Sequence, residues 1–130
     1  MYVTEADLDR LWALAENRQV PGGRLLAREL ERAVVVSDEE LPANFARLGS
    51  MVRYRDLLSG RSRTLRIVAP QDADLQAERL SVISPIGAAL IGLRPGDVFA
   101  LTTEDGRPHV LQVLSVGAPS GVDPALAEEA

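Results

Sequence analysis

Apolar residues recur every three or four positions in two segments near the N-terminus, and this spacing predicts two amphipathic helices. The first helix is expected over residues 4–17, with Thr4 as its N-cap, and the second over residues 24–35. The apolar stripes consist of Leu8, Leu11, Trp12 and Ala15 in the first helix, and of Leu26, Leu30, Ala33 and Val34 in the second. Because a Trp in such a stripe usually packs internally, we expect Trp12 to do so.

A short connection separates the two predicted helices. It contains Arg18, Gln19, Val20 and Pro21, followed by the pair Gly22-Gly23, and both Pro and Gly interrupt helices. Two helices joined in this way form an antiparallel helical hairpin. We therefore expect such a hairpin over residues 1–36, with Arg18, Gln19, Val20 and Pro21 at its tip. At 1.5 Å per residue, each arm would be about 18–21 Å long.

Beyond residue 50 the pattern changes to alternation of apolar and polar residues, which favours β-strands. Five short strands are expected, over residues 51–57, 64–69, 80–84, 98–103 and 109–116. Ser59-Gly60 and Asp105-Gly106 are typical of the turns between paired strands. The predicted fold class is α+β, with a twisted antiparallel sheet over residues 51–116 packed on one short helix. Residues 37–50 would be a linker, and residues 117–130 a flexible tail.

Residues 80–101 predict a strand, a short helix, a turn and a second strand in succession. Ser84 is a suitable N-cap for the helix, and Pro85 occupies the first helical position, where its missing N–H is not needed. Gly92 can end the helix in a left-handed conformation. The sequence Arg94-Pro95-Gly96-Asp97 then fits a type II turn.

Composition excludes several functions. The 130 residues suffice for one small domain, and the net charge of −5 argues against sequence-independent binding to DNA or RNA. All 14 basic residues are Arg, which genomic base composition explains; selection for bidentate carboxylate contacts is the alternative. No apolar run is long enough to span a membrane, so the protein is expected in the cytoplasm. We also expect a monomer.

The sequence contains no pattern typical of a catalytic or metal site. There is no Cys, and the single His, His109, has no Ser or Asp partner that the sequence nominates. Asp72, Asp74 and Glu78 lack the Gly and the terminal Glu of a calcium-binding loop. No phosphate-binding or dinucleotide-binding motif occurs. We expect no enzymatic activity, no metal and no cofactor.

The segment from Ser84 to Gly92, followed by Arg94-Pro95-Gly96-Asp97, resembles the signature of the C-terminal domain of the transcript-cleavage factors GreA and GreB. The linker, which begins Ser37-Asp38-Glu39-Glu40, extends the resemblance to the short-armed Rnk group, named for regulation of nucleoside diphosphate kinase. The resemblance covers the chain apart from about its last dozen residues. It implies an FKBP-like fold for residues 51–116.

The resemblance also implies a partner. Cleavage factors insert a long helical hairpin, with acidic residues at its tip, into the secondary channel of bacterial RNA polymerase. Here the matching tip holds no carboxylate, although Glu16 is close, and the arm is short. The implied function is a non-enzymatic transcription regulator that binds polymerase at the channel rim without stimulating cleavage and competes with Gre-type factors. By the same resemblance, Ile83, Ser84 and Pro85 would contact polymerase; alternatively, Ser84 and Pro85 only cap the helix.

The sequence is also compatible with two other functions. The chain could be a protein-binding module that acts directly on a metabolic enzyme, without polymerase. It could also be a weak peptidyl-prolyl isomerase or chaperone, since FKBP folds can isomerise prolyl bonds. The second idea is weakened because Tyr54 and Phe99 are the only aromatic residues from position 51 onward, too few for the aromatic pocket of active isomerases.

Overall fold

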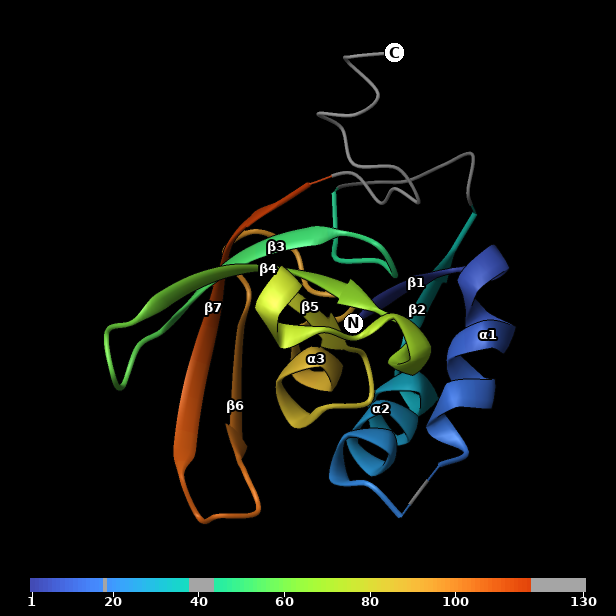
Figure 1. Ribbon diagram of the computed structural model, residues 1–130. Coiled ribbons are helices and arrows are strands. Elements are labelled where there is room, and N and C mark those ends of the chain that lie inside the picture. Colours follow the sequence, from blue (N-terminus) through green and yellow to red (C-terminus); the bar gives the residue numbers. More distant parts are fainter. Residues whose placement is uncertain (18, 38–43, 118–130) are drawn as a thin grey trace.

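A curled sheet surrounds one short helix; a second helix packs on this helix, and a third packs on the second (Figure 1). The computed structural model describes residues 1–17, 19–37 and 44–117. The helices are α1 (Glu5–Ala15), α2 (Pro21–Glu31) and α3 (Pro85–Leu90), with 3₁₀ turns η1 (Pro70–Asp72) and η2 (Leu75–Ala77). The strands are β1 (Tyr2–Thr4), β2 (Val34–Val36), β3 (Met51–Asp56), β4 (Ser62–Val68), β5 (Arg79–Ser81), β6 (Val98–Thr102) and β7 (Pro108–Val116).

The main sheet has the order β5-β4-β3-β7-β6, with β3 at its centre. Val52 and Tyr54 of β3 are buried on its concave face, whereas Arg53 and Arg55 are exposed on the opposite face. The predicted α+β fold, with five strands and a short helix, is confirmed. One pair differs from the prediction, because β5 runs parallel to β4. The connection over residues 69–78 crosses over through η1 and η2, so the chain does not reverse direction as a tight hairpin would.

The second predicted helix was wrong at both ends. It begins at Pro21 instead of residue 24, because Pro suits the first helical position and the following Gly pair lies in close packing contacts. It ends at Glu31 instead of residue 35. The run Val34–Val36 forms β2, parallel to β1, because three successive β-branched residues favour an extended strand over a helix.

The helices and the sheet share one hydrophobic core. Its buried members from the two N-terminal helices include Leu11, Ala15 and Leu26, and they belong to the same cluster as Val52 and Ile67 from the sheet. Trp12 is half-buried and packs against this cluster. The sequence left open whether the helical hairpin projects freely; the structure shows that it packs against the rest of the protein.

The strand predicted over residues 80–84 is shorter, because β5 ends at Ser81 and the chain turns over residues 82–84 to enter α3; the predicted cap, helix end and turn that follow are confirmed. The Ser84 hydroxyl accepts a hydrogen bond from the Gly87 N–H at 3.1 Å and caps α3. Gly92 follows α3 with φ +81°, in the left-handed region. The Asp97 N–H donates to the Arg94 carbonyl oxygen at 2.9 Å, which closes the predicted turn.

Three predicted features lie outside the described residues: Arg18 at the tip, the acidic cluster Asp38-Glu39-Glu40 of the linker, and the tail from residue 118. Among the described residues, no helix reaches the length and apolar character needed to cross a membrane.

Candidate partner-binding site

The predicted hairpin tip and the predicted contact loop lie against each other. Gly22, in the first turn of α2, approaches the backbone of Ile83 and Ser84, just before α3. A Cβ at Gly22 would stand 1.8 Å from the Ile83 carbonyl oxygen and 2.6 Å from the Ser84 carbonyl carbon. Only glycine permits this approach, so the first turn of α2 rests directly on the segment that enters α3.

A groove runs between α2 and β6 from this contact. It has a volume of about 490 Å³, and Pro21 and Pro85, one from each predicted site, both line it. Phe99 and Leu101 of β6 contribute apolar surface, and Leu25 of α2 does the same. The groove thus combines apolar side chains with the charged side chains of α2 and of Glu104.

Three arginines of α2 and its C-terminal end, at positions 24, 28 and 32, line the groove at intervals of one helical turn. Arg32 pairs with Glu29 at 2.6 Å, and Arg24 lies 3.9 Å from Glu104, which follows β6. Arg28 lines the groove without a hydrogen bond or ion pair to another residue in the described part of the chain. This side of the groove therefore offers a guanidinium group to an acidic partner.

Ile83 and Ser84 are both held in place by local structure. The Ile83 N–H donates to the Ser81 hydroxyl at 3.2 Å, and the Ser84 hydroxyl donates to the Ser81 carbonyl oxygen at 2.6 Å. Ile83 is half-buried and packs against the hydrophobic core. A change at Ile83 would therefore affect folding as well as binding, whereas Pro85 opens onto the groove.

The remaining tip residues surround this contact. Gln19 is exposed and Val20 is half-buried, and Val20 precedes α2 as its N-cap residue without a side-chain capping hydrogen bond. Pro21 belongs to α2 itself. The structure thus brings Pro21 and Pro85 to one groove, with Val20 at the adjoining helix end.

The sequence nominated no partner for His109, and the structure supplies one, Asp56. The His109 Nδ1 lies 2.8 Å from Asp56 Oδ2, although 53 positions separate the two residues. No local motif indicates this pair, because the contact forms only when the ends of β3 and β7 are brought together by sheet pairing. Burial would raise the pKa of Asp56, but hydrogen bonds from His109, Leu58 and Val110 lower it below the ordinary value.

Thr103 completes an arrangement that looks like a catalytic triad. Its Oγ1 lies 3.5 Å from His109 Nε2, which is too long for proton transfer. The same hydroxyl is already engaged by Asp105 Oδ1 at 2.5 Å and by the Arg107 carbonyl oxygen at 3.2 Å. These contacts fix the turn between β6 and β7 and leave no activated nucleophile.

Comparison with known proteins places this architecture in a family. Residues 41–118 match the family described as transcription elongation factor, GreA/GreB, C-term, and residues 1–36 match the family described as Rnk N-terminus. The curled sheet around α3 is the fold of that C-terminal domain. The chain therefore belongs to the GreA/GreB family of transcription elongation factors, and it carries the N-terminus typical of Rnk members.

Individual relatives agree with this assignment. The regulator of nucleoside diphosphate kinase of Escherichia coli (strain K12) is 33% identical over 117 residues, which span 88% of this chain and 86% of that protein. Transcription elongation factor GreA of Thermotoga neapolitana is 36% identical over 96 residues, 71% of this chain and 61% of that protein.

The solved structure of a prokaryotic GreA/GreB elongation factor from Nitrosomonas europaea has a TM-score of 0.70 at 33% identity. The match covers 91% of this chain and 98% of that chain. The crystal structure of Thermus aquaticus Gfh1 has a TM-score of 0.52 at 29% identity, over 75% of this chain and 62% of that chain. These neighbours share the fold of a family of transcription regulators.

Proposed function

We propose that this protein is a non-enzymatic transcription regulator that docks on bacterial RNA polymerase near the rim of the secondary channel. It competes there with Gre-type factors and does not stimulate transcript cleavage. The observation that carries the proposal is the contact of Gly22 with Ile83, which joins the hairpin tip to the loop that enters α3. Family membership supports a role in transcription.

The geometry of the hairpin supports the absence of cleavage. α1 and α2 have 11 residues each, so each arm is about 16 Å long. The first turn of α2 rests beside α3, so the start of α2 lies close to the sheet domain. The described tip residues from Asn17 to Gly23 include no carboxylate that could hold a catalytic magnesium ion.

The proposed contact surface combines the groove with the α3 entry. Pro21 and Pro85 provide apolar contact, and the guanidinium of Arg28 provides a charged contact. Ser84 retains its capping role, because its hydroxyl is committed to Gly87 and Ser81. In this arrangement Pro85 contacts the partner directly, whereas Ile83 and Ser84 mainly position it.

Competition on purified RNA polymerase tests the proposal. A backtracked elongation complex should show no added cleavage with this protein alone, and GreA-stimulated cleavage should fall as its concentration rises. Pro85→Asn should weaken this competition about tenfold, since it removes an apolar contact worth roughly 1.4 kcal/mol. Pro95→Asn is the matched control, because Pro95 is exposed in a turn outside the groove.

Two results would refute the proposal. One is cleavage of backtracked RNA by this protein without a Gre factor. The other is an unchanged GreA cleavage rate at saturating protein, combined with no measurable binding to polymerase. Circular dichroism of Pro85→Asn separates a lost contact from a lost fold.

A second function is favoured by one finding, the name of the Escherichia coli relative, regulator of nucleoside diphosphate kinase. In this alternative the same groove binds a metabolic enzyme directly. Purified nucleoside diphosphate kinase should then bind the protein in the absence of polymerase, and Arg28→Glu should reduce that binding. No binding to the purified kinase would exclude this alternative.

A further inference from the structure

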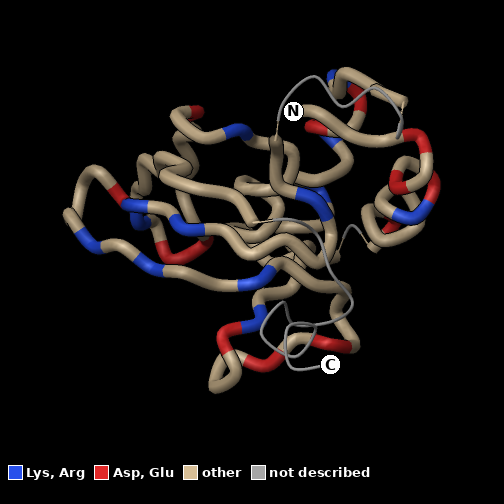
Figure 2. The backbone as a smooth tube through the Cα atoms, turned by 90° about the horizontal axis from the view of Figure 1, so that it is seen from above, with Lys and Arg blue, Asp and Glu red and all other residues tan. Residues whose placement is uncertain are grey.

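The β3–β4 hairpin concentrates positive charge in an acidic protein. Residues 51–66, here called the arginine hairpin, contain five arginines and one aspartate, a net charge of +4. Because the whole chain carries −5, the remaining residues carry −9. Figure 2 shows basic residues along both strands of this hairpin, which extends away from the helices. The arginines are Arg53, Arg55, Arg61, Arg63 and Arg66.

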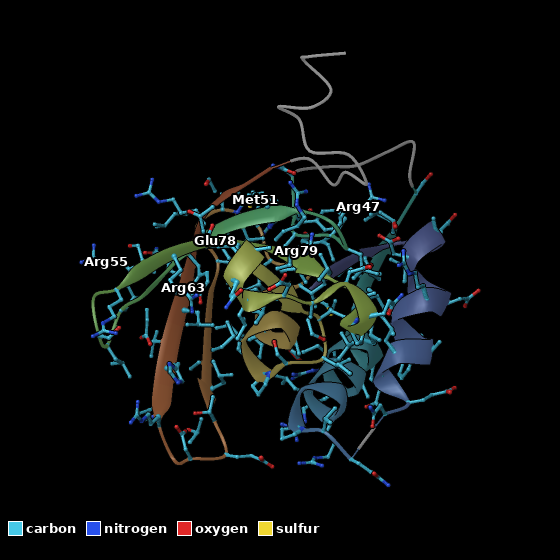
Figure 3. The ribbon with its side chains drawn as sticks, viewed as in Figure 1. Arg47, Met51, Arg55, Arg63, Glu78 and Arg79 are labelled. Carbon is cyan, nitrogen blue, oxygen red and sulfur yellow. The ribbon has the colours of Figure 1, made fainter. Side chains whose placement is uncertain are left out.

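Most of these guanidinium groups do not take part in contacts that stabilise the fold. Arg66 donates to the Gly49 carbonyl oxygen at 2.5 Å. The other four arginines are exposed, and their guanidinium groups form no hydrogen bond or ion pair within residues 1–17, 19–37 and 44–117. Like charges that lie this close repel one another, so the cluster does not stabilise the fold. Arg63 is the direct cross-strand partner of Tyr54 and lies on the concave face of the hairpin, whereas Arg53 and Arg55 lie on the opposite face (Figure 3).

Charged side chains can protect a free sheet edge from pairing with another strand, but this role explains only some of the arginines in the hairpin. β5 pairs with β4 at positions 66–68, so residues 62–65 form a free edge that a charged side chain such as Arg63 protects. Arg53 and Arg55, however, lie on β3, the central strand, which pairs on both sides. They are two positions apart on one face, roughly 7 Å along the strand. This face therefore offers neighbouring guanidinium groups that are free to bind carboxylates.

The turn of the hairpin adds apolar surface. Leu57 is 47% exposed and Leu58 is 59% exposed, close to the arginines in the chain. Arginine next to exposed aliphatic residues is typical of protein interfaces, where apolar contact accompanies paired charges. A nucleic acid fits less well, because the hairpin has no exposed aromatic residue for base stacking.

We propose that the arginine hairpin is a second interaction surface, which binds an acidic segment of a protein partner that also carries aliphatic side chains. Bidentate pairs between guanidinium and carboxylate groups fix the segment, and Leu57 and Leu58 contact its aliphatic residues. This inference does not depend on polymerase as the partner. The surface lies on the sheet, whereas the groove lies between α2 and β6.

Fluorescence anisotropy with labelled probes tests the inference without polymerase. The probes are a Glu-rich peptide with interspersed Leu, a poly-Glu peptide of equal length, and a single-stranded DNA oligonucleotide of equal charge. The full chain should bind the Glu/Leu peptide most tightly. The double variant Arg53→Glu/Arg55→Glu should bind it about tenfold or more weakly, since each reversal replaces attraction by repulsion.

Matched variants define the contribution of each group. Arg53→Lys/Arg55→Lys keeps the charge but loses the bidentate geometry, so its affinity should be intermediate. Leu57→Ser/Leu58→Ser should weaken binding of the Glu/Leu peptide while leaving poly-Glu binding unchanged. Arg10→Glu and Arg107→Glu, both exposed and outside the hairpin, should have little effect. The inference is overturned if DNA binds through Arg53 and Arg55 as tightly as the peptide, or if no probe responds to their reversal.

Discussion

Gly22 of α2 and Ile83 before α3 approach so closely that no methyl group fits between them, since a Cβ at Gly22 would stand 1.8 Å from the Ile83 carbonyl oxygen. This contact seats the two N-terminal helices on the sheet domain. It also places the hairpin connection beside the loop that we propose contacts polymerase.

Gly22→Ala should destabilise the protein although alanine favours helices by about 0.8–1.0 kcal/mol over glycine. The added methyl group meets backbone atoms, which cannot move aside, so a net loss of about 1–3 kcal/mol is expected. Urea denaturation measures this loss. Arg28→Ala, in the same helix and exposed, should change stability by no more than about 0.5 kcal/mol. Equal stability of Gly22→Ala and wild type would contradict the close contact.

Gly92→Ala should destabilise the protein through both backbone strain and steric overlap, and Gly96→Ala separates these two effects. Its φ of +81° disfavours any side chain, and a Cβ there would stand 2.5 Å from Met1 Cβ and 2.7 Å from the Tyr2 carbonyl oxygen. Gly96 has φ +92°, and a Cβ added there would meet no atom within 4 Å. Gly96→Ala should therefore cost about 1–2 kcal/mol from backbone strain alone. Gly92→Ala should lower the thermal midpoint clearly further, and similar midpoints would show that β1 does not crowd Gly92.

Asp56 should make stability depend on acid pH. Burial alone would raise its pKa, but hydrogen bonds from His109 and two backbone N–H groups bring the pKa in the folded protein below the ordinary value of 3.8. Its contribution is therefore present above pH 3.8 and is lost as pH falls through the lower folded value. Asp56→Ala should cost about 1–3 kcal/mol at neutral pH.

Urea denaturation at neutral and acid pH measures the contribution of the Asp56 charge to stability. The difference in stability between wild type and Asp56→Ala should shrink on acidification. The pKa of Asp105 is also lowered, by its hydrogen bond from Thr103, so Asp105→Asn serves as the comparison on an exposed carboxyl group. A stability difference for Asp56→Ala that is independent of pH would contradict the role of its charge.

Tyr54 should make stability depend on alkaline pH. Burial raises the pKa of Tyr54 above 10.0, the Arg63 charge lowers it, and the Asp56 charge raises it, with burial the largest effect. The neutral phenol is thus favoured in the fold, so its contribution to stability is complete below pH 10.0 and is lost as pH rises through the folded value. Spectrophotometric titration should show a late phenol ionisation that disappears in Tyr54→Phe. If the late ionisation persisted in Tyr54→Phe, it would belong to a group other than Tyr54.

Local features were predictable because their physical causes span few residues. The Thr4 hydroxyl accepts from the Asp7 N–H at 3.2 Å, and the cap at Ser84 is set by residues three positions apart. The alternation of Val52 and Tyr54 with exposed arginines likewise follows from strand geometry. These patterns were sufficient for the fold class.

The helix boundaries failed where tertiary contacts outweighed local preference. Gly22 and Gly23 are usually helix breakers, yet both lie within α2, where their missing side chains permit close packing against Ile83 and Asn17. The pairing of β1 with β2 joins segments about 30 residues apart, and a three-residue strand has no periodicity that identifies it.

The caps, the turns, the amphipathic faces and the family signature could be read from the order of residues, because each depends on neighbouring positions. Three relationships required the folded chain: Pro21 and Pro85 line one groove, Asp56 binds His109, and the helical hairpin packs on the sheet domain. They join distant positions through backbone approach and sheet pairing, whose geometry exists only after the chain has folded.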